Sequence, residues 1–438
     1  MNKDKLIPEL RFPEFLNTED WNEVEFGELL SLLSDYTANG SFASLKENVQ
    51  YYTSEEYAVL VRTTDLEKKE FTPARFTDKR GYDFLSKTSL FGGEIIMANV
   101  GSIGKVYKAP FYDKPMTLAP NTYVLKFKKG VDEEFIYQLM LRTEFEQKLL
   151  SMVGSSTLKA INKKNLRSIE IAIPKSNEQQ KIASCLSSLD EILAAHNDKL
   201  DALKDHKKGL LQNLFPQEGE TVPKVRFPEF EDDGEWVESN IQSLLDNKII
   251  ISHLDGNHGA LYPRAEEFSE DGVPYLTAND FISGTVDFRY CKHLPLERAK
   301  KFKKGVAKNG DILFAHNATV GPVAKLITDL PFVILSTTAT YYRCDNESLI
   351  NDFLRYALES PFFVAQYTRV MSQSTRNQVP ITTQRKFNLQ LPAPMEQQKI
   401  ASCLSAVDEL ITAQQEKIEQ LQQHKKGLMQ GLFPKIER

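Results

Sequence analysis

Residues 178–216 read EQQKIASCLSSLDEILAAHNDKLDALKDHKKGLLQNLFP, and residues 396–434 read EQQKIASCLSAVDELITAQQEKIEQLQQHKKGLMQGLFP. The two stretches are identical at 24 of 39 positions, far more than chance produces within one chain. Such self-similarity at a fixed offset is the signature of an internal repeat. The 438-residue chain is therefore a tandem duplication, and its length allows two or three domains.

The duplication extends upstream of both stretches, but only at isolated anchors. The anchors are IPELRFPEF (7–15) with VPKVRFPEF (222–230), the two tryptophans Trp21 and Trp236, and GGEIIMANVGSIGKV (92–106) with NGDILFAHNATVGPV (309–323). Between these anchors the two halves diverge almost completely. Two similar scaffolds that carry different side chains favour two recognition surfaces, one in each half, over one active site divided between them.

Both conserved stretches carry apolar residues at steps of three and four, which is the pattern of a coiled-coil seam. The predicted helix-pair packing residues are Ile182, Leu186, Leu189, Leu193, Leu200 and Leu203 in the first copy, and Ile400, Leu404, Val407, Ile411, Ile418 and Leu421 in the second. Polar residues fill the gaps in the seam and are expected to fix its register. They are His196, Lys207, Gln414 and Lys425.

The length of these stretches predicts that the two helices pack together. A helix over 182–214 would be about 48 Å long. It would be too one-sided to be stable alone, so each copy needs the other as a partner. Pro216 and Pro434 predict where the helices end. The second half begins at Val222, soon after the first helix ends, so the simplest connection makes the pair antiparallel.

The remaining segments, 22–177 and 237–395, predict strand-rich heads of mixed α/β structure. We expect strands within 57–65, 94–98, 169–173, 272–280, 311–315 and 387–391, and helices over 135–150 and 350–370. The predicted fold class is α/β (α+β) recognition domains, duplicated with pseudo-two-fold symmetry and separated by two long antiparallel coiled-coil helices. The predicted domains are 1–177 (first recognition domain), 178–216 (first spacer helix), 217–395 (second recognition domain) and 396–438 (second spacer helix).

Polar loops recur at matched positions of the two heads with changed residues. Glycine lets a backbone approach a ligand closely, and Asn, Gln, Ser, Thr and Arg are the side chains that read base edges and bind phosphate oxygens. A polar surface loop is weak evidence alone, but its recurrence with altered side chains predicts a DNA-reading surface. The candidate DNA-binding residues are Arg62, Thr63, Asn99, Ser102, Lys105, Ser155, Thr157, Lys159, Thr277, Asn279, His316, Asn317, Thr319, Thr375, Arg376, Asn377 and Gln378.

Bulk composition limits the class of protein. A content of 41% hydrophobic and 26% charged residues is typical of a globular chain. The apolar runs are too short to cross a bilayer, and MNKDKLIPEL at the N-terminus lacks the core of a signal peptide, so we expect a cytoplasmic protein. The net charge of −6 counts against a nucleic-acid binder, although local clusters of Lys and Arg matter more than the total.

The sequence predicts no catalysis by this chain alone. The glycine-containing stretch GSIGK at 101–105 is too short for a phosphate-binding loop, and the chain has no Asn-Pro-Pro-aromatic motif of adenine methyltransferases. The four cysteines form no CxxC pair, and His253 and His258 lack a third metal ligand nearby. We therefore expect no metal and no cofactor bound by the chain itself.

The arrangement resembles the specificity subunit of type I restriction–modification systems. The residues that carry the resemblance are RFPEF followed by Trp in each half, the GEII and GDIL segments, the EQQKIA helix start and the HKKGLxQxLFP helix end. The resemblance implies two target-recognition domains that each read part of a split DNA site, with the helices setting the spacer. It also implies docking to two methyltransferase subunits, which use S-adenosylmethionine to methylate adenine, and to two restriction–translocase subunits, which use ATP and Mg²⁺.

Two other functions remain open from the sequence. A two-headed coiled-coil adaptor that binds proteins in place of DNA would account for the helices, but not for the divergent interiors of the two heads. An enzyme fused to its own recognition module is the third hypothesis, and the missing methyltransferase and nuclease motifs speak against it.

Overall fold

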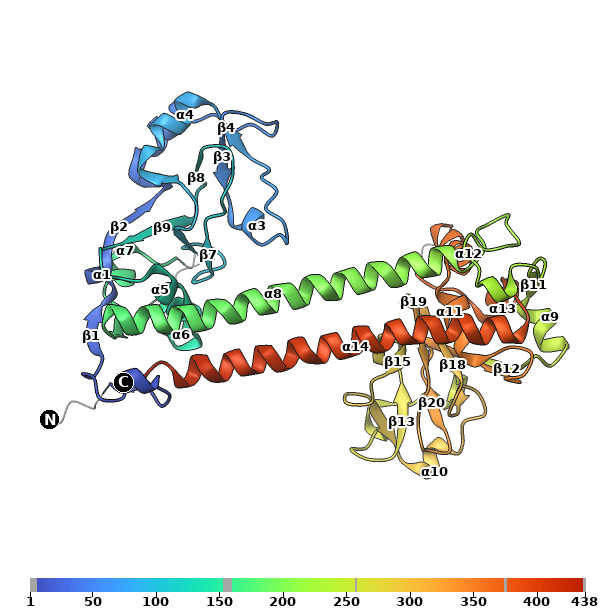
Figure 1. Cartoon of the computed structure of the whole chain (residues 1–438). Coiled ribbons are helices and arrows are strands. Elements are labelled where there is room, and N and C mark those ends of the chain that lie inside the picture. The colour runs from blue at the N-terminus through green and yellow to red at the C-terminus, as the bar shows by residue number, and fades with distance from the viewer. Residues whose placement is uncertain (1–5, 153–159, 257, 374–375, 436–438) are drawn as a thin grey trace. The chain divides into compact units, whose positions relative to one another are not determined.

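The structure, a computed structural model, describes residues 6–152, 160–256, 258–373 and 376–435 (Figure 1). The chain forms two compact units. Unit 1 contains residues 1–195 and 418–438, and unit 2 contains residues 196–417. Each unit therefore combines one head with a segment of both long helices. We call residues 6–175 head 1 and residues 214–393 head 2.

Head 1 contains two four-stranded sheets, with strand orders β2-β9-β6-β7 and β4-β3-β8-β5, and the two-stranded sheet β1-β10. Its strands are β1 (Asn22–Glu25), β2 (Leu30–Asp35), β3 (Ala58–Val61), β4 (Phe76–Thr77), β5 (Ser89–Leu90), β6 (Ile95–Ala98), β7 (Val106–Lys108), β8 (Met116–Leu118), β9 (Thr122–Phe127) and β10 (Glu170–Ile173). Its helices are α1 (Phe26–Leu29), α2 (Phe42–Asn48), α3 (Thr63–Leu66), α4 (Lys79–Phe84), α5 (Glu133–Met140), α6 (Thr143–Ser151) and α7 (Lys163–Arg167).

Head 2 repeats this topology with one addition. Its sheets have strand orders β12-β21-β18-β19-β15-β14, β16-β13-β20-β17 and β11-β22, so β15 and β14 extend the first sheet beyond the four strands found in head 1. The strands are β11 (Val237–Asn240), β12 (Ile250–Asp255), β13 (Val273–Leu276), β14 (Phe281–Ile282), β15 (Thr285–Val286), β16 (Lys292–Leu294), β17 (Val306–Ala307), β18 (Ile312–Asn317), β19 (Thr319–Lys325), β20 (Val333–Leu335), β21 (Ala339–Cys344) and β22 (Asn388–Leu391). The helices are α9 (Ile241–Asp246), α10 (Leu296–Ala299), α11 (Asn351–Glu359), α12 (Pro361–Ser372) and α13 (Ile381–Gln384).

The matched strands β6 and β18 are apolar throughout because each lies between two cores. Ile95 and Met97 point into the core that contains α5 and α6, while Ile96 points into the core of the second sheet. In β18, Phe314 and Leu313 divide in the same way between two cores. Alternate residues of a strand face opposite sides of the sheet, so burial on both sides requires a continuous apolar run. The predicted strands 94–98 and 311–315 are confirmed.

Two predicted helices are wrong as single elements. The segment 135–150 forms α5 and α6, with a break at Leu141 and Arg142, and the segment 350–370 forms α11 and α12, with a break at Ser360. Ser360 caps α12 by accepting a hydrogen bond from the backbone N–H of Phe363, and Pro361 occupies the first helical position. A serine followed by proline starts a new helix and ends the previous one. Hydrophobic periodicity alone does not reveal such a break.

The two long helices are α8 (Ser176–Asn213) and α14 (Pro394–Gly431), each of 38 residues. Within each unit, a segment of α8 lies beside a segment of α14 (Figure 1). In unit 1 the Asp190 carboxylate accepts a hydrogen bond from Lys425 at 2.5 Å, and in unit 2 Lys207 lies 3.0 Å from Asp408. Within unit 2, Gln414 bonds to His196 and Asp408 pairs with Lys207, so residue numbers fall along α14 as they rise along α8, and the predicted antiparallel pairing is confirmed.

The polar residues in the gaps of the seam form hydrogen bonds and ion pairs between the two helices. Lys425 and Lys207 make the two contacts given above. Gln414 donates hydrogen bonds at 2.7 Å to both Nδ1 and the backbone oxygen of His196. The apolar seam residues nearest the helix starts, such as Ile182 and Ile400, join the cores of heads 1 and 2. The other predicted packing residues are buried or half-buried along the pair. Each helix therefore serves as a core element of a head at its start and as a partner helix beyond it.

The end of each long helix completes the core of a unit. Phe215, just beyond α8, stacks on Phe353 with ring centroids 5.5 Å apart and meets Trp236 edge-on at 5.9 Å. At the end of α14, Phe433 stacks at 5.3 Å on a phenylalanine of α5, Phe135. It also meets Trp21 edge-on at 6.0 Å. The conserved LFP ends of the two repeats are therefore buried aromatic anchors.

Asp408→Asn is expected to destabilise unit 2 by about 3 kcal/mol, because it removes the nearer of the two carboxylates that pair with the buried guanidinium of Arg355. Burial alone would raise the pKa of Asp408, but Arg355 and Lys207 hold this pKa below its usual value. The ionised form therefore stabilises the fold above about pH 4, and the difference between wild type and variant should shrink as pH falls further. Urea unfolding between pH 3 and pH 7 measures this.

Asp190→Asn is the matched control in unit 1. Its side chain is 42% exposed, against 16% for Asp408, and ion pairs in such surroundings contribute at most about 1 kcal/mol. An equal loss of stability in both variants would contradict the role of burial in unit 2.

Candidate nucleic-acid interface

The polar loops of head 1 meet at one edge of its sheets. Arg62 follows β3, Asn99 follows β6, and a turn at Asn121 follows β8. Strands β3 and β8 are parallel, so their carboxyl ends lie side by side. The backbone N–H of Ala119 donates to the oxygen of Val61 at 3.0 Å, and the N–H of Asn99 donates to the oxygen of Asn121 at 3.1 Å. The turn after β8 therefore holds the two predicted loops together.

Head 2 builds the same edge from different side chains. The turn between β20 and β21 contains Thr338, whose hydroxyl accepts a hydrogen bond from the backbone N–H of Ala278 at 2.9 Å. The backbone oxygen of Thr338 accepts a hydrogen bond from the N–H of His316, also at 2.9 Å. The loop that holds Thr277 and Asn279 is thereby tied to the loop that holds His316 and Asn317.

The loop that precedes the last strand of each head joins this edge. In head 1, Val100 forms an isolated β-bridge with Ala160, and in head 2 Asn317 forms one with Gln378. The backbone N–H of Ala318 also donates to the oxygen of Asn377 at 3.0 Å. The same pairing of two loops therefore occurs in both heads, with Val and Ala in one and Asn and Gln in the other.

Three candidate DNA-binding residues are engaged within their own head. Arg62 makes two hydrogen bonds, at 2.7 and 2.9 Å, to the buried carboxylate of Asp65. Lys105 pairs with Glu67 at 2.8 Å. His316 is 3% exposed, its Nδ1 lies 3.2 Å from the backbone oxygen of Val379, and burial lowers its pKa, so it is held neutral. These contacts indicate that the three residues position loops.

Of these three residues only His316 is buried, since Arg62 is half-buried and Lys105 exposed. The remaining candidates in the described ranges are exposed or half-buried: Thr63, Asn99, Ser102, Thr277, Asn279, Asn317, Thr319, Arg376, Asn377 and Gln378. The amide oxygen of Asn99 is itself buried, and no hydrogen bond reaches it among the described residues. Thr277 donates its backbone N–H and its hydroxyl to Asp280 at 2.6 and 2.9 Å. Ser155, Thr157, Lys159 and Thr375 lie outside the residues that the structure describes.

Each head has a groove beside these loops. The groove of head 1 encloses about 770 Å³ and is lined by Asn99 and Asn121 together with the exposed Tyr51, Thr37 and Lys46. The groove of head 2 encloses about 570 Å³ and is lined by Thr277 and Asn279 together with Tyr262, Tyr290 and Thr337. Exposed aromatic rings beside amide and hydroxyl groups are suited to contacts with bases and sugars.

The sequence matches, over residues 18–205 and 251–423, the family described as the type I restriction modification DNA specificity domain. The matched residues make up most of the chain, and there is one match for each copy of the repeat. The chain belongs to this family. As a specificity subunit it has a role in DNA target recognition, and the resemblance carried by the RFPEF, EQQKIA and LFP segments is confirmed.

Relatives of similar length support the assignment. The specificity subunit is 24% identical to the type I restriction enzyme MjaVIII specificity subunit of Methanocaldococcus jannaschii, over 95% of this chain and 92% of that one. Its fold resembles the crystal structure of a type I restriction–modification S subunit from M. genitalium, with a TM-score of 0.58 at 16% identity over 99% and 100% of the two chains. A second chain, from a structural study of complex assembly in the type I R-M system, gives a TM-score of 0.53 at 15% identity over 94% and 97%.

Within the described ranges, no helix has both the length and the apolar content needed to cross a membrane. No group of three or more His, Cys, Asp or Glu side chains is placed to hold a metal ion in that part of the chain.

The sequence did not single out several residues of the two grooves. Asn121, which has a positive φ of 72°, and Thr337 and Thr338 lie in turns between strands that carry no glycine. Tyr262 and Tyr290 lie in segments whose sequences diverge from the first half, and neither matches a tyrosine there. The feature of the sequence that could have identified the turn residues is the short polar segment after β8 and after β20, because in each half it separates two matched apolar strands.

Proposed function

We propose that this specificity subunit reads a split DNA target, one part with each head, and leaves all chemistry to partner subunits. The observation that supports this proposal is that each head builds an equivalent loop edge of its own. Three polar loops meet there through equivalent backbone contacts, while the side chains differ between the heads. A scaffold that is kept while its loops change is what two independent readers of different base sequences require.

The reading contacts would come from the accessible polar side chains beside each groove. Amide side chains pair with adenine through its N6 and N7 atoms, and hydroxyls accept or donate to several bases. In head 2 the best-placed amides are the exposed Asn279 and the half-buried Asn317 and Gln378. We assign residues 1–177 and 217–395 to the two recognition domains, and 178–216 and 396–438 to the spacer helices.

The spacer helices would set the gap between the two half-sites and dock the partners. A helix of 38 residues extends about 57 Å, which is long enough to separate two half-sites by one turn of DNA, about 34–36 Å. We propose that two methyltransferase subunits, which use S-adenosylmethionine to methylate adenine at N6, and two restriction–translocase subunits, which use ATP and Mg²⁺, complete a cytoplasmic complex. A net charge of −6 fits a subunit that shares its grip on phosphates with such partners.

The test is selection of duplexes from a random library by the assembled methyltransferase complex. We expect a two-part motif with an unspecified spacer, and binding that weakens steeply as salt rises. The protein-binding adaptor hypothesis predicts no enriched motif and an affinity for protein that salt hardly changes. An absence of any enriched sequence would contradict the proposed function.

Asn279→Ala is expected to relax base preference at one position of one half-site by about 1–3 kcal/mol, the value of a good contact to a base edge. The matched variant in head 1 is Ser102→Ala, which removes an exposed loop hydroxyl. It should weaken preference in the other half-site only. Competition binding with singly substituted duplexes measures both. A change in both half-sites from either single variant would argue against independent heads.

A further inference from the structure

The hairpin of β14 and β15 distinguishes the two heads. It spans Phe281 to Val286 and follows directly on the reading loop that holds Thr277 and Asn279. In head 1 the equivalent stretch after α3, residues 67–75, is described throughout and contains no strand, so β7 ends the sheet there. Head 2 therefore forms a β-hairpin directly after its reading loop, where the described residues of head 1 form none.

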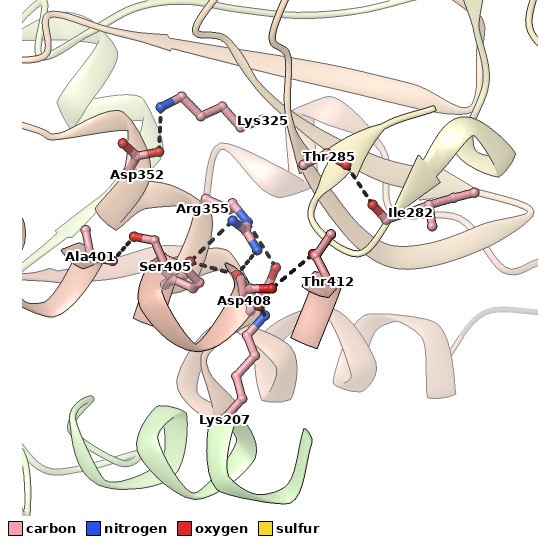
Figure 2. A network of polar contacts seen from close by, with 12 residues as sticks. Lys207, Ile282, Thr285, Lys325, Asp352, Arg355, Ala401, Ser405, Asp408 and Thr412 are labelled. Atoms are coloured by element: carbon pink, nitrogen blue, oxygen red, sulfur yellow. Dashed lines mark hydrogen bonds and ion pairs between the residues drawn. The ribbon is translucent and has the colours of Figure 1, made fainter. Parts of the chain in front are cut away.

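The tip of this hairpin rests on one guanidinium group. Gly284 has a φ of +79°, and a Cβ added there would overlap the guanidinium of Arg355. Only glycine meets both conditions, the positive φ and the close approach. The hairpin is held on its other side by β19, where the backbone N–H of Lys325 donates to the oxygen of Gly284 at 2.9 Å. Figure 2 shows Arg355 beside the turn that carries Ile282 and Thr285, with Asp408 and Lys207 on its other side.

Arg355 itself belongs to the charged cluster of the helix pair. Its guanidinium pairs with Asp408 of α14 and lies 3.6 Å from Glu359 of α11. Lys207 of α8 lies 3.0 Å from the same Asp408 (Figure 2). It also lies 2.8 Å from Glu359, so it bridges the two carboxylates. The Arg355 side chain is 8% exposed. The guanidinium that supports the hairpin is therefore held by α14 directly, through Asp408, and by α8 indirectly, through the carboxylates that it shares with Lys207.

The other end of the hairpin is joined to the reading loop. Phe281 is buried in the core of the second sheet. The backbone N–H of Asp287 donates to the backbone oxygen of Asp280 at 2.8 Å. The carboxylate of Asp280 in turn accepts hydrogen bonds from the backbone N–H and the hydroxyl of Thr277. A short path of direct contacts thus leads from the helix pair through Arg355 and Gly284 to the loop beside the groove.

Unit 1 has no such path among its described residues. The position of Arg355 is occupied by Tyr137 in the repeat, and the position of Glu359 by Leu141. Asp190 of α8 receives hydrogen bonds from Gln138 at 2.8 Å and from Lys425. Glu67, just past α3, pairs with Lys105 and Tyr107 of its own head. The helix pair of unit 1 therefore contacts the base of head 1 and does not contact its reading loop through a hairpin.

We propose that the β14–β15 hairpin is a positioning element, which holds the reading loop of head 2 at a set angle to the helix pair and so restricts the spacer lengths that the subunit accepts. This inference rests on the proposed function, because it concerns the gap between two DNA half-sites. Gly284 and Arg355 are its positioning residues. They contact no DNA, and base preference lies with the loops.

Gly284→Ala tests the proposal. A Cβ at this position pushes the hairpin and the guanidinium apart. In the assembled methyltransferase complex, affinities are measured for duplexes whose spacers differ by single base pairs around the preferred length. We expect discrimination between adjacent spacer lengths to fall by about five-fold or more, the lower end of energetic coupling between separate sites. The preferred bases in both half-sites should not change.

Gly219→Ala is the matched control. Gly219 has a φ of +84°, but nothing lies within 4 Å of an added Cβ, so this variant carries the same backbone strain without the contact. It should keep the wild-type spacer preference. Arg355→Lys is the second test variant, because it keeps a positive charge beside Asp408 but removes the planar guanidinium on which Gly284 lies. It should broaden the spacer preference as Gly284→Ala does.

The outcomes separate the two hypotheses. A wild-type complex that selects a two-part motif supports the proposed function. The positioning role is then overturned if either test variant keeps sharp spacer discrimination, or if it changes the preferred bases of a half-site. If the wild-type complex selects no motif, the proposed function fails, and the positioning role fails with it.

Discussion

Phe433→Ala is expected to lower the free energy of unfolding of unit 1 by about 3–5 kcal/mol, the range for truncation of a buried phenylalanine. Phe433 is 1% exposed and touches both Phe135 and Trp21. The remaining cavity would lie where the end of α14 meets head 1. Since unfolding free energies of domains are only about 5–15 kcal/mol, this loss should be readily visible.

The two tryptophans make the measurement specific. Trp21 lies in the core of unit 1 and Trp236 in the core of unit 2, and the chain contains no others. In a Trp236→Phe background, fluorescence during urea unfolding reports on unit 1, and in a Trp21→Phe background it reports on unit 2. Phe433→Ala should shift the first transition and leave the second nearly unchanged.

Phe215→Ala is the matched variant for unit 2, because Phe215 packs on Phe353 and Trp236 in the same geometry. It should shift the Trp236 transition and spare the Trp21 transition. The contrary result, in which each variant shifts both transitions equally, would mean that the two units unfold as one and that the anchors do not act locally.

Insertion of seven residues into both long helices is expected to lengthen the preferred DNA spacer by about three base pairs. Seven residues add about 10.5 Å to a helix, and successive base pairs are about 3.4 Å apart. Seven residues are two turns of a coiled coil, so the seam stays in phase. The insertion points are between Ala195 and His196 and between Lys417 and Ile418, where unit 1 meets unit 2 along the chain.

Selection from a duplex library by the assembled complex measures both spacer and base preference. Both half-site sequences should be unchanged, because the groove residues are untouched. The control places the same seven residues beside Gly219, an exposed turn outside the helices, and should leave the spacer as it is. An unchanged spacer after insertion into both helices, or altered half-site bases, would contradict a helix pair that sets the gap.

The long helices could be predicted well because their signals are local and repeated. The apolar steps from Ile182 to Leu203, the proline after each LFP end and the absence of interior breakers leave little alternative to a helix. The strands β6 and β18 could be predicted for a similar reason, since burial on both faces demands a continuous apolar run.

The candidate site could be predicted only at the level of loops. A polar residue after a strand can point into a groove, bond to its own head or be buried, and the choice depends on neighbours that are distant in sequence. His316 and Asn317 are adjacent, yet His316 is buried against Val379 while Asn317 is half-buried at the loop edge. Arg62 is held by Asp65, which the sequence places only three residues away but does not show to be buried.

The duplication, the two seams and the position of the variable loops follow from the order of the residues, because each is a pattern along the chain. The three-dimensional fold sets which half of each helix serves which head, which polar residues remain accessible, and the contact of Gly284 with Arg355. Those outcomes depend on burial and on contacts between segments far apart in the chain, and such contacts leave no periodic trace in the order of the residues.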